Sequence, residues 1–211
     1  MSRPDWVDRQ LRRRGIEDSR VLAAMGRVPR ELFVPERLRA HAYDDAALQI
    51  GYRQTISQPY VVARICEALE LSGDESVLDV GTGSGYQAAV LAELARSVLS
   101  IERVPALAEG ARTALEAAGY ANVEILVGDG SVGVPERAPF PAIAVGAAAR
   151  RPPPSLLAQL APRGRLVLPV GNSRLQHLVM IQRTDDGFTT RRLAEVRFVP
   201  LRGAEGVHEV R

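Results

Sequence analysis

The sequence contains no lysine, since all 27 of its basic residues are arginine. A lysine Schiff base and a lysine general base are therefore excluded. The one cysteine, Cys66, excludes a disulfide framework. The histidines His41, His177 and His208 are far apart and lack the spacing of metal ligands, so we expect no metal site. The net charge of +2 is too small to indicate binding to nucleic acid or to a membrane surface.

Long apolar segments are also missing. No uncharged run approaches the roughly 20 residues that span a membrane, and the first residues contain no apolar segment of a secretory signal. We therefore expect a cytoplasmic protein. A length of 211 residues with 46% hydrophobic and 25% charged residues is ordinary for a globular chain. We expect one domain over 1–211, with a helical amino-terminal elaboration over 1–72 and an α/β core over 73–211.

Strand and helix patterns alternate from residue 76 onward. The predicted strands cover 76–80, 97–102, 123–127, 142–145, 164–171, 175–183 and 189–199, and the predicted helices cover 85–95, 105–118 and 155–160. This alternation indicates an α/β fold with a mostly parallel, doubly wound sheet, closed by an antiparallel pair at the carboxyl end. Ahead of the core we expect two short helices within 5–25, broken at Gly15, and a helix that begins at Pro59.

The stretch from Ser76 to Gly85 is the most informative part of the chain. An apolar strand leads to Asp79, and glycines follow at alternate positions, beginning with Gly81 and Gly83, before a helical segment. This order indicates a strand, a tight turn and a helix at the start of a βαβ unit. The turn also fits the dinucleotide pattern G-x-G-x-x-A, so it does not identify a ligand by itself.

Asp79 distinguishes between two candidate ligands. The pyrophosphate of a dinucleotide lies at the amino end of the helix, where a fixed carboxylate repels it. S-adenosylmethionine has no phosphate and carries an ammonium and a sulfonium group, so the same carboxylate attracts it. A simpler interpretation, an acid that only caps the turn, also stays open.

Two more acids follow predicted strands of the same sheet. Glu102 ends the second strand, close to the ~20-residue spacing of an acid that binds ribose hydroxyls. Asp129 follows the third strand, between Gly128 and Gly130, and can accept a hydrogen bond from an adenine amino group. In parallel α/β sheets, ligands bind at the edge where the carboxyl ends of the strands meet. Together the acids favour an adenosyl cofactor, although each alone is typical of a turn.

A polar segment, Gln-Thr-Ile-Ser-Gln over 54–58, precedes the helix that begins at Pro59. Ser57 therefore lies at a helix start, where serine commonly acts as the N-cap. The segment also comes just ahead of the core unit, so it can line the mouth of a site. Spacing alone leaves both interpretations of Ser57 open.

With these motifs in view, the sequence resembles the protein-L-isoaspartate O-methyltransferase family over nearly its whole length. The similarity lies in the blocks Val28–Pro35, Gln54–Tyr60, Leu78–Tyr86, Val127–Gly130, Val145–Ala148, Gly164–Gly171 and Phe198–Leu201. Many methyltransferases share the glycine block. The Thr-Ile-Ser-x-Pro block, together with Val-Pro-Leu near the carboxyl end, is much more particular to this family.

The resemblance implies a Rossmann-like methyltransferase fold with a seven-stranded sheet. It implies methyl transfer from S-adenosylmethionine to the α-carboxyl group of L-isoaspartyl residues in damaged proteins and peptides, which initiates their repair. Ser57 matches the active-site serine. Cofactor contacts are assigned on the same basis to Gln54, Thr55, Asp79, Gly81, Thr82, Gly83, Glu102, Asp129 and Gly130, with no metal.

The implied acceptor is a carboxylate, which is ionised at neutral pH and needs no general base. Ser57 is then expected to position the acceptor, and no G-x-S-x-G elbow surrounds it as in serine nucleophiles. The chain departs from the family pattern at Pro141, just before the predicted fourth strand, where an acid is usual. It also departs at Arg150 and Arg151, beside the expected cleft, where the added charge can alter which substrates are admitted.

Three alternatives stay open. The first is an S-adenosylmethionine-dependent methyltransferase that acts on a small-molecule carboxylate or on RNA, although the N-P-P-Y motif of base methylation is absent. The second is an NAD-dependent oxidoreductase, which Asp79 disfavours. The third is a homologue that binds the cofactor without turnover, indicated only by Pro141, Arg150 and Arg151.

Overall fold

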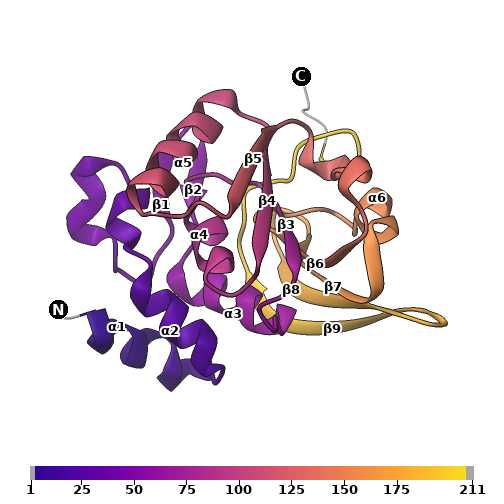
Figure 1. Ribbon diagram of the computed structural model, residues 1–211, viewed down its shortest axis with the longest axis horizontal. Helices are drawn as coiled ribbons and strands as arrows, with labels where there is room; N and C mark the ends of the chain where they lie inside the picture. Colours follow the sequence, from indigo (N-terminus) through magenta and orange to yellow (C-terminus); the bar gives the residue numbers. More distant parts are fainter. Residues whose placement is uncertain (1–2, 208–211) are drawn as a thin grey trace.

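The computed structural model of the protein describes residues 3–207, and its central feature is a seven-stranded sheet (Figure 1). The strands lie in the order β5-β4-β3-β6-β7-β8-β9. The first five in this order are parallel, and β8 is antiparallel to both of its neighbours. The strands are β3 (Ser76–Val80), β4 (Ser97–Glu102), β5 (Val123–Val127), β6 (Phe140–Val145), β7 (Leu160–Gly171), β8 (Gln176–Thr184) and β9 (Gly187–Val196). The predicted seven-stranded, mostly parallel sheet with an antiparallel carboxyl end is thereby confirmed.

Helices begin where local sequence favours them. The Asp18 side chain accepts hydrogen bonds from the first amides of α2, and Pro59 lies in the first turn of α3. The α-helices are α1 (Arg3–Gln10), α2 (Ser19–Arg27), α3 (Pro59–Leu69), α4 (Tyr86–Ala92), α5 (Pro105–Ala117) and α6 (Pro154–Ala158). Short 3₁₀ helices are η1 (Arg12–Arg14), η2 (Arg30–Phe33), η3 (Glu36–His41), η4 (Gly130–Val132) and η5 (Pro135–Arg137). Over residues 3–207, no helix is both long and apolar enough to cross a bilayer.

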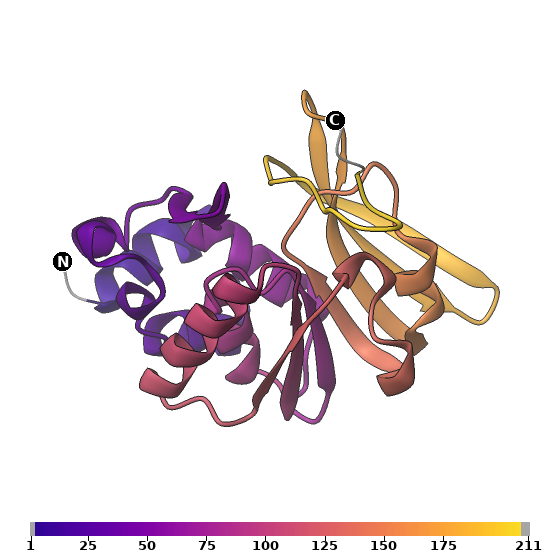
Figure 2. The same cartoon turned by 90° about the horizontal axis from the view of Figure 1, so that it is seen from above.

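The sheet is covered on both faces. Successive strand residues point to opposite sides, so Val77 belongs to one core cluster and Leu78 to the other. The first cluster joins the sheet to α1–α5, and the second joins it to α6 and the loop before it. In Figure 2 the amino-terminal helices and the β8–β9 strands lie on opposite sides of the molecule. The carboxyl edge of the parallel strands is left accessible between these layers.

A small antiparallel hairpin, β1 (Leu48–Gly51) and β2 (Gln54–Ile56), was not predicted from the sequence. Its two-residue turn consists of Tyr52 and Arg53, which both have positive φ. Such turns normally carry Asn or Gly, so the local pattern did not identify a hairpin.

Pro141 lies inside β6, which begins at Phe140, so the prediction that it precedes the strand was wrong. The register of β6 against β7 shifts between Phe140 and Ala142. Pro141 therefore occupies an irregularity where the ladder needs no N–H from it. The end of α6 at Ala158 and the start of β7 at Leu160 also differ from the prediction, which placed that strand at 164–171.

Candidate active site

The glycine turn after β3 forms the floor of the candidate site. Gly81 and Gly83 have φ of +90° and +54°, and Gly85 has φ +89° just before α4. A Cβ at Gly85 would lie 3.2 Å from the Ala111 side chain on α5, so glycine also permits the close packing of that helix. Because these glycines have no side chains, the backbone of the turn is left uncovered at the carboxyl edge of the sheet.

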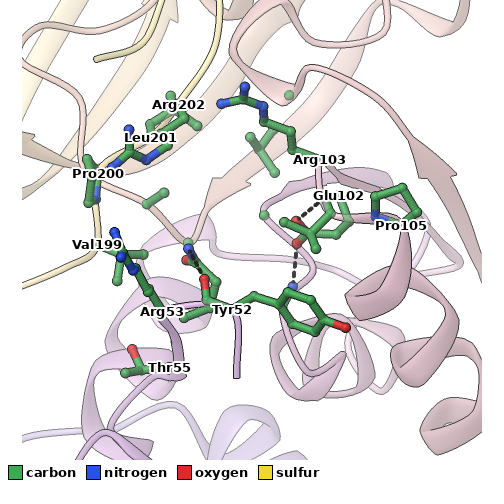
Figure 3. A pocket seen from close by; sticks show the side chains of 18 residues that line it. Tyr52, Arg53, Thr55, Glu102, Arg103, Pro105, Val199, Pro200, Leu201 and Arg202 are labelled. Atoms are coloured by element: carbon green, nitrogen blue, oxygen red, sulfur yellow. Dashed lines mark hydrogen bonds between the residues drawn. The ribbon is translucent and has the colours of Figure 1, made fainter. Parts of the chain in front are cut away.

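A cavity of about 450 Å³ lies over this turn (Figure 3), within the range usual for small-ligand sites. Its walls come from the β1–β2 turn, the glycine turn, the segment after β4, the segment after β6 and a carboxy-terminal segment over 199–202. Among the predicted cofactor residues, those that line it are Gln54, Thr55, Gly81, Gly83, Glu102 and Gly130. The side chains of Asp79, Thr82 and Asp129 are not part of its wall.

Glu102 supplies the one carboxylate on the wall of this cavity. It is 7% exposed, and its two oxygens accept hydrogen bonds from the amides of Gly83 at 2.8 Å and Val104 at 2.9 Å. These bonds hold the carboxylate at the end of β4 beside the turn. Each oxygen keeps a second lone pair, so the group can accept hydrogen bonds from a pair of hydroxyls, as expected for a ribose.

Asp79 lies beneath the turn with no exposed surface. Its carboxylate accepts hydrogen bonds from Gln87 Nε2 at 2.8 Å and Ser100 Oγ at 2.6 Å, and the Thr82 and Ser100 hydroxyls are 2.6 Å apart. Burial raises the pKa of Asp79, although these hydrogen bonds oppose the rise. Asp79 and Thr82 thus hold the turn to β4 and α4, and the predicted charge contact of Asp79 with a ligand stays a prediction.

Asp129 does not line the cavity and makes internal hydrogen bonds. Its carboxylate accepts hydrogen bonds from the amide and hydroxyl of Ser131, at 2.9 and 2.7 Å, and from the Ala204 amide at 2.7 Å. Burial alone would raise the pKa of Asp129. The hydrogen bonds lower it by more than burial raises it, so its pKa lies below the usual value. Asp129 therefore ties the carboxy-terminal segment in place, and its contact with an adenine group stays a prediction.

Ser57 does not cap α3. The N-cap position belongs to Gln58, and no side chain bonds the free amides there. Ser57 instead lines a second cavity of about 380 Å³, and Thr55, Gly146 and Val199 line both this cavity and the larger one. The two cavities are therefore adjacent. A small third cavity of about 30 Å³ is lined by Ser57 together with Gly81 and Gly83, so Ser57 lies beside the glycine turn.

Sequence reasoning missed a buried arginine that supports Ser57. Arg30 has no exposed surface; its Nη2 donates to the Ser57 carbonyl at 2.8 Å, and its Nε donates to the Ala42 carbonyl at 2.7 Å. Its guanidinium also lies 4.6 Å from the centre of the Tyr86 ring. The available signal was its place in the apolar block Val28–Pro35, where an arginine must find internal partners.

The charge of the larger cavity also differs from the acid-tipped pocket predicted from the sequence. Arg53, Arg103 and Arg202 line it together with the single acid Glu102 (Figure 3). Arg150 and Arg151 are exposed and line neither cavity, so their predicted place beside the cleft is not seen at these walls. No group of three potential metal ligands occurs within residues 3–207.

A parallel sheet with a glycine turn after its central strand, an acid at the end of the neighbouring strand and a cavity above both fit a protein that binds an adenosyl cofactor, and the comparisons with known proteins identify the class as an S-adenosylmethionine-dependent methyltransferase. The family model described as protein-L-isoaspartate(D-aspartate) O-methyltransferase matches residues 4–206. The chain belongs to this family.

Individual relatives agree with the family model. A protein-L-isoaspartate O-methyltransferase 1 from Rhodopseudomonas palustris is 54% identical over 206 residues, which cover 97% of this chain and 84% of the relative. A protein-L-isoaspartate O-methyltransferase 2 from Pelobacter propionicus is 54% identical over 202 residues, which cover 95% of this chain and 90% of the relative. A crystal structure of the Plasmodium falciparum protein in complex with S-adenosyl-L-homocysteine matches with a TM-score of 0.81 and 28% identity, covering 96% of this chain and 99% of that one.

Proposed function

We propose that the protein transfers a methyl group from S-adenosylmethionine to the α-carboxyl group of L-isoaspartyl residues in damaged proteins and peptides, which initiates their repair. The observation that carries this proposal is the pair of adjacent cavities, with Glu102 and the glycine turn on one and Ser57 on the other. A donor and an acceptor can thus meet where Thr55, Gly146 and Val199 line both cavities.

The residues of the larger cavity suit an adenosyl cofactor. Glu102 offers acceptors for ribose hydroxyls, and the glycine turn allows close approach of a ligand to its backbone. Gln54, Thr55 and Gly130 complete the part of the wall assigned to the cofactor. When bound, S-adenosylmethionine supplies a methyl group on a sulfonium, which is already a strong electrophile.

The acceptor side needs positioning more than proton transfer. An α-carboxylate is ionised at neutral pH, and no histidine lines either cavity. Ser57 donates its hydroxyl hydrogen to the acceptor and holds it toward the methyl group. Positioning of this kind, together with the exclusion of water, can account for a large part of a rate enhancement.

Transfer of labelled methyl from S-adenosylmethionine to matched isoaspartyl and aspartyl peptides tests the proposal. Label on the isoaspartyl peptide alone supports it. Label on neither peptide contradicts it; if S-adenosylhomocysteine still binds, the result favours an inactive homologue or a methyltransferase of small-molecule carboxylates.

Three sequence-based expectations stay predictions. Division of one domain into 1–72 and 73–211 is testable by limited proteolysis, because a separate unit would release a stable fragment. A cytoplasmic location is testable by cell fractionation. The absence of nucleic-acid and membrane partners is testable by co-sedimentation with RNA and with anionic vesicles.

A further inference from the structure

The turn between β1 and β2 has an unfavourable backbone for its residues. Tyr52 and Arg53 have φ of +50° and +59°, and side chains with a Cβ are strained in this left-handed region. Glycine or asparagine would form the same turn with less strain. Strained non-glycine residues concentrate at ligand sites, so an arginine here points to a function of its side chain.

Arg53 lies where the two cavities meet. It lines the larger cavity next to Thr55 and Val199, which line both cavities. Figure 3 shows its side chain between the hairpin and the carboxy-terminal segment. Within residues 3–207, its guanidinium makes no hydrogen bond or ion pair. This exposed cation on the cavity wall therefore has no carboxylate of the described residues paired with it.

We propose that Arg53 binds a carboxylate that enters this junction. Arginine suits such a partner because its planar guanidinium can form two parallel charge-assisted hydrogen bonds with a carboxylate. Glu102, the one acid on the wall of the larger cavity, already accepts hydrogen bonds from two backbone amides, and Glu195 on the second cavity makes no ion pair with Arg53. Under the proposed function, on which this inference rests, the carboxylate comes either from the methionyl part of the cofactor or from the peptide substrate.

The test replaces Arg53 with the residue that the turn itself favours. Arg53→Gly removes the charge and relieves the strained φ, so the variant should melt no lower than the wild type. Arg163→Gly is the matched control, because Arg163 is also an exposed arginine with φ +61° and lines neither cavity. Calorimetry measures the Kd of S-adenosylhomocysteine and of 5′-methylthioadenosine, which lacks the amino-acid portion. Kinetics measures the KM for an isoaspartyl peptide.

Loss of a charge-assisted pair should weaken binding about tenfold. If S-adenosylhomocysteine weakens and 5′-methylthioadenosine does not, Arg53 binds the cofactor carboxylate. If both Kd values hold and the peptide KM rises, Arg53 binds the substrate carboxylate. An Arg53→Gly variant that matches Arg163→Gly in every measurement overturns the proposal. Failure of the proposed function would be seen separately, because the wild-type protein would then methylate no isoaspartyl peptide. The calorimetric comparison of S-adenosylhomocysteine with 5′-methylthioadenosine would still decide whether Arg53 binds the cofactor carboxylate.

Discussion

Replacing Arg30 by methionine should reduce both stability and catalysis, for separable reasons. Methionine fills much of the buried space but cannot donate to the carbonyls of Ala42 and Ser57. Hydrogen bonds from charged groups contribute about 1.5–3 kcal/mol each. The gain from no longer burying a charge, seen in the burial that lowers the pKa of Arg30, offsets part of this loss.

We therefore expect a net loss of about 2–4 kcal/mol in the free energy of unfolding. For a chain of this size, that corresponds to a fall in Tm of roughly 4–16 °C. The catalytic effect should exceed what this instability explains, because the freed Ser57 carbonyl lets the segment 55–57 shift. We expect kcat/KM for an isoaspartyl peptide to fall about tenfold or more, with a smaller change in the Kd of S-adenosylhomocysteine.

Arg20→Met is the matched control. Arg20 likewise donates to two backbone carbonyls, those of Leu71 at 2.5 Å and Leu94 at 3.1 Å, but it lines neither cavity. Its loss should lower Tm and leave kcat/KM unchanged below the melting transition. Arg30→Lys, which keeps the charge, should recover part of the activity. If Arg30→Met and Arg20→Met show the same kcat/KM, Arg30 acts only on stability and the positioning argument is refuted.

Three further predictions concern the site residues found in the sequence. Ser57→Ala should lower turnover while the Kd of S-adenosylhomocysteine and the Tm stay near wild type, because Ser57 makes no cap bond; an equal loss of cofactor binding would contradict this. Asp79→Ala should lower the free energy of unfolding by about 2–4 kcal/mol, since two buried donors lose their acceptor, and should weaken S-adenosylhomocysteine through the distorted turn; unchanged affinity by calorimetry would refute the link. Asp129 has a lowered folded-state pKa, so its tie to Ala204 stabilises the carboxy-terminal segment above the unfolded pKa of about 3.9 and is lost as the pH falls through the folded value. Hydrogen exchange at the Ala204 amide should report that loss below about pH 4, and Asp129→Asn should show weaker protection already at neutral pH.

The strand periodicity explains why Asp79 and the cavity are separated. Val77 and Asp79 share one face of β3, while Leu78 and Val80 share the other. The alternation is readable from the sequence, but only packing decided that α4 covers the face of Asp79 and brings Gln87 to its carboxylate. An acid beside glycines therefore identified the turn, while the hydrogen bonds of Asp79 with Gln87 and Ser100 could be seen only in the structure.

Local chemistry allowed the sequence alone to determine the order of strands and helices in the α/β core, the glycine turn, the helix start at Pro59 and the family. Apolar runs, glycines and prolines act within a few residues, so their effects are visible in the chain itself. Only the tertiary structure decided which side chains meet at the ligand edge. Arg53, Arg103 and Arg202 come from the β1–β2 turn, the end of β4 and the carboxy-terminal segment, and Arg30 reaches Ser57 from η2. Contacts between such distant segments depend on how the whole sheet and its helices pack, and no local pattern encodes them.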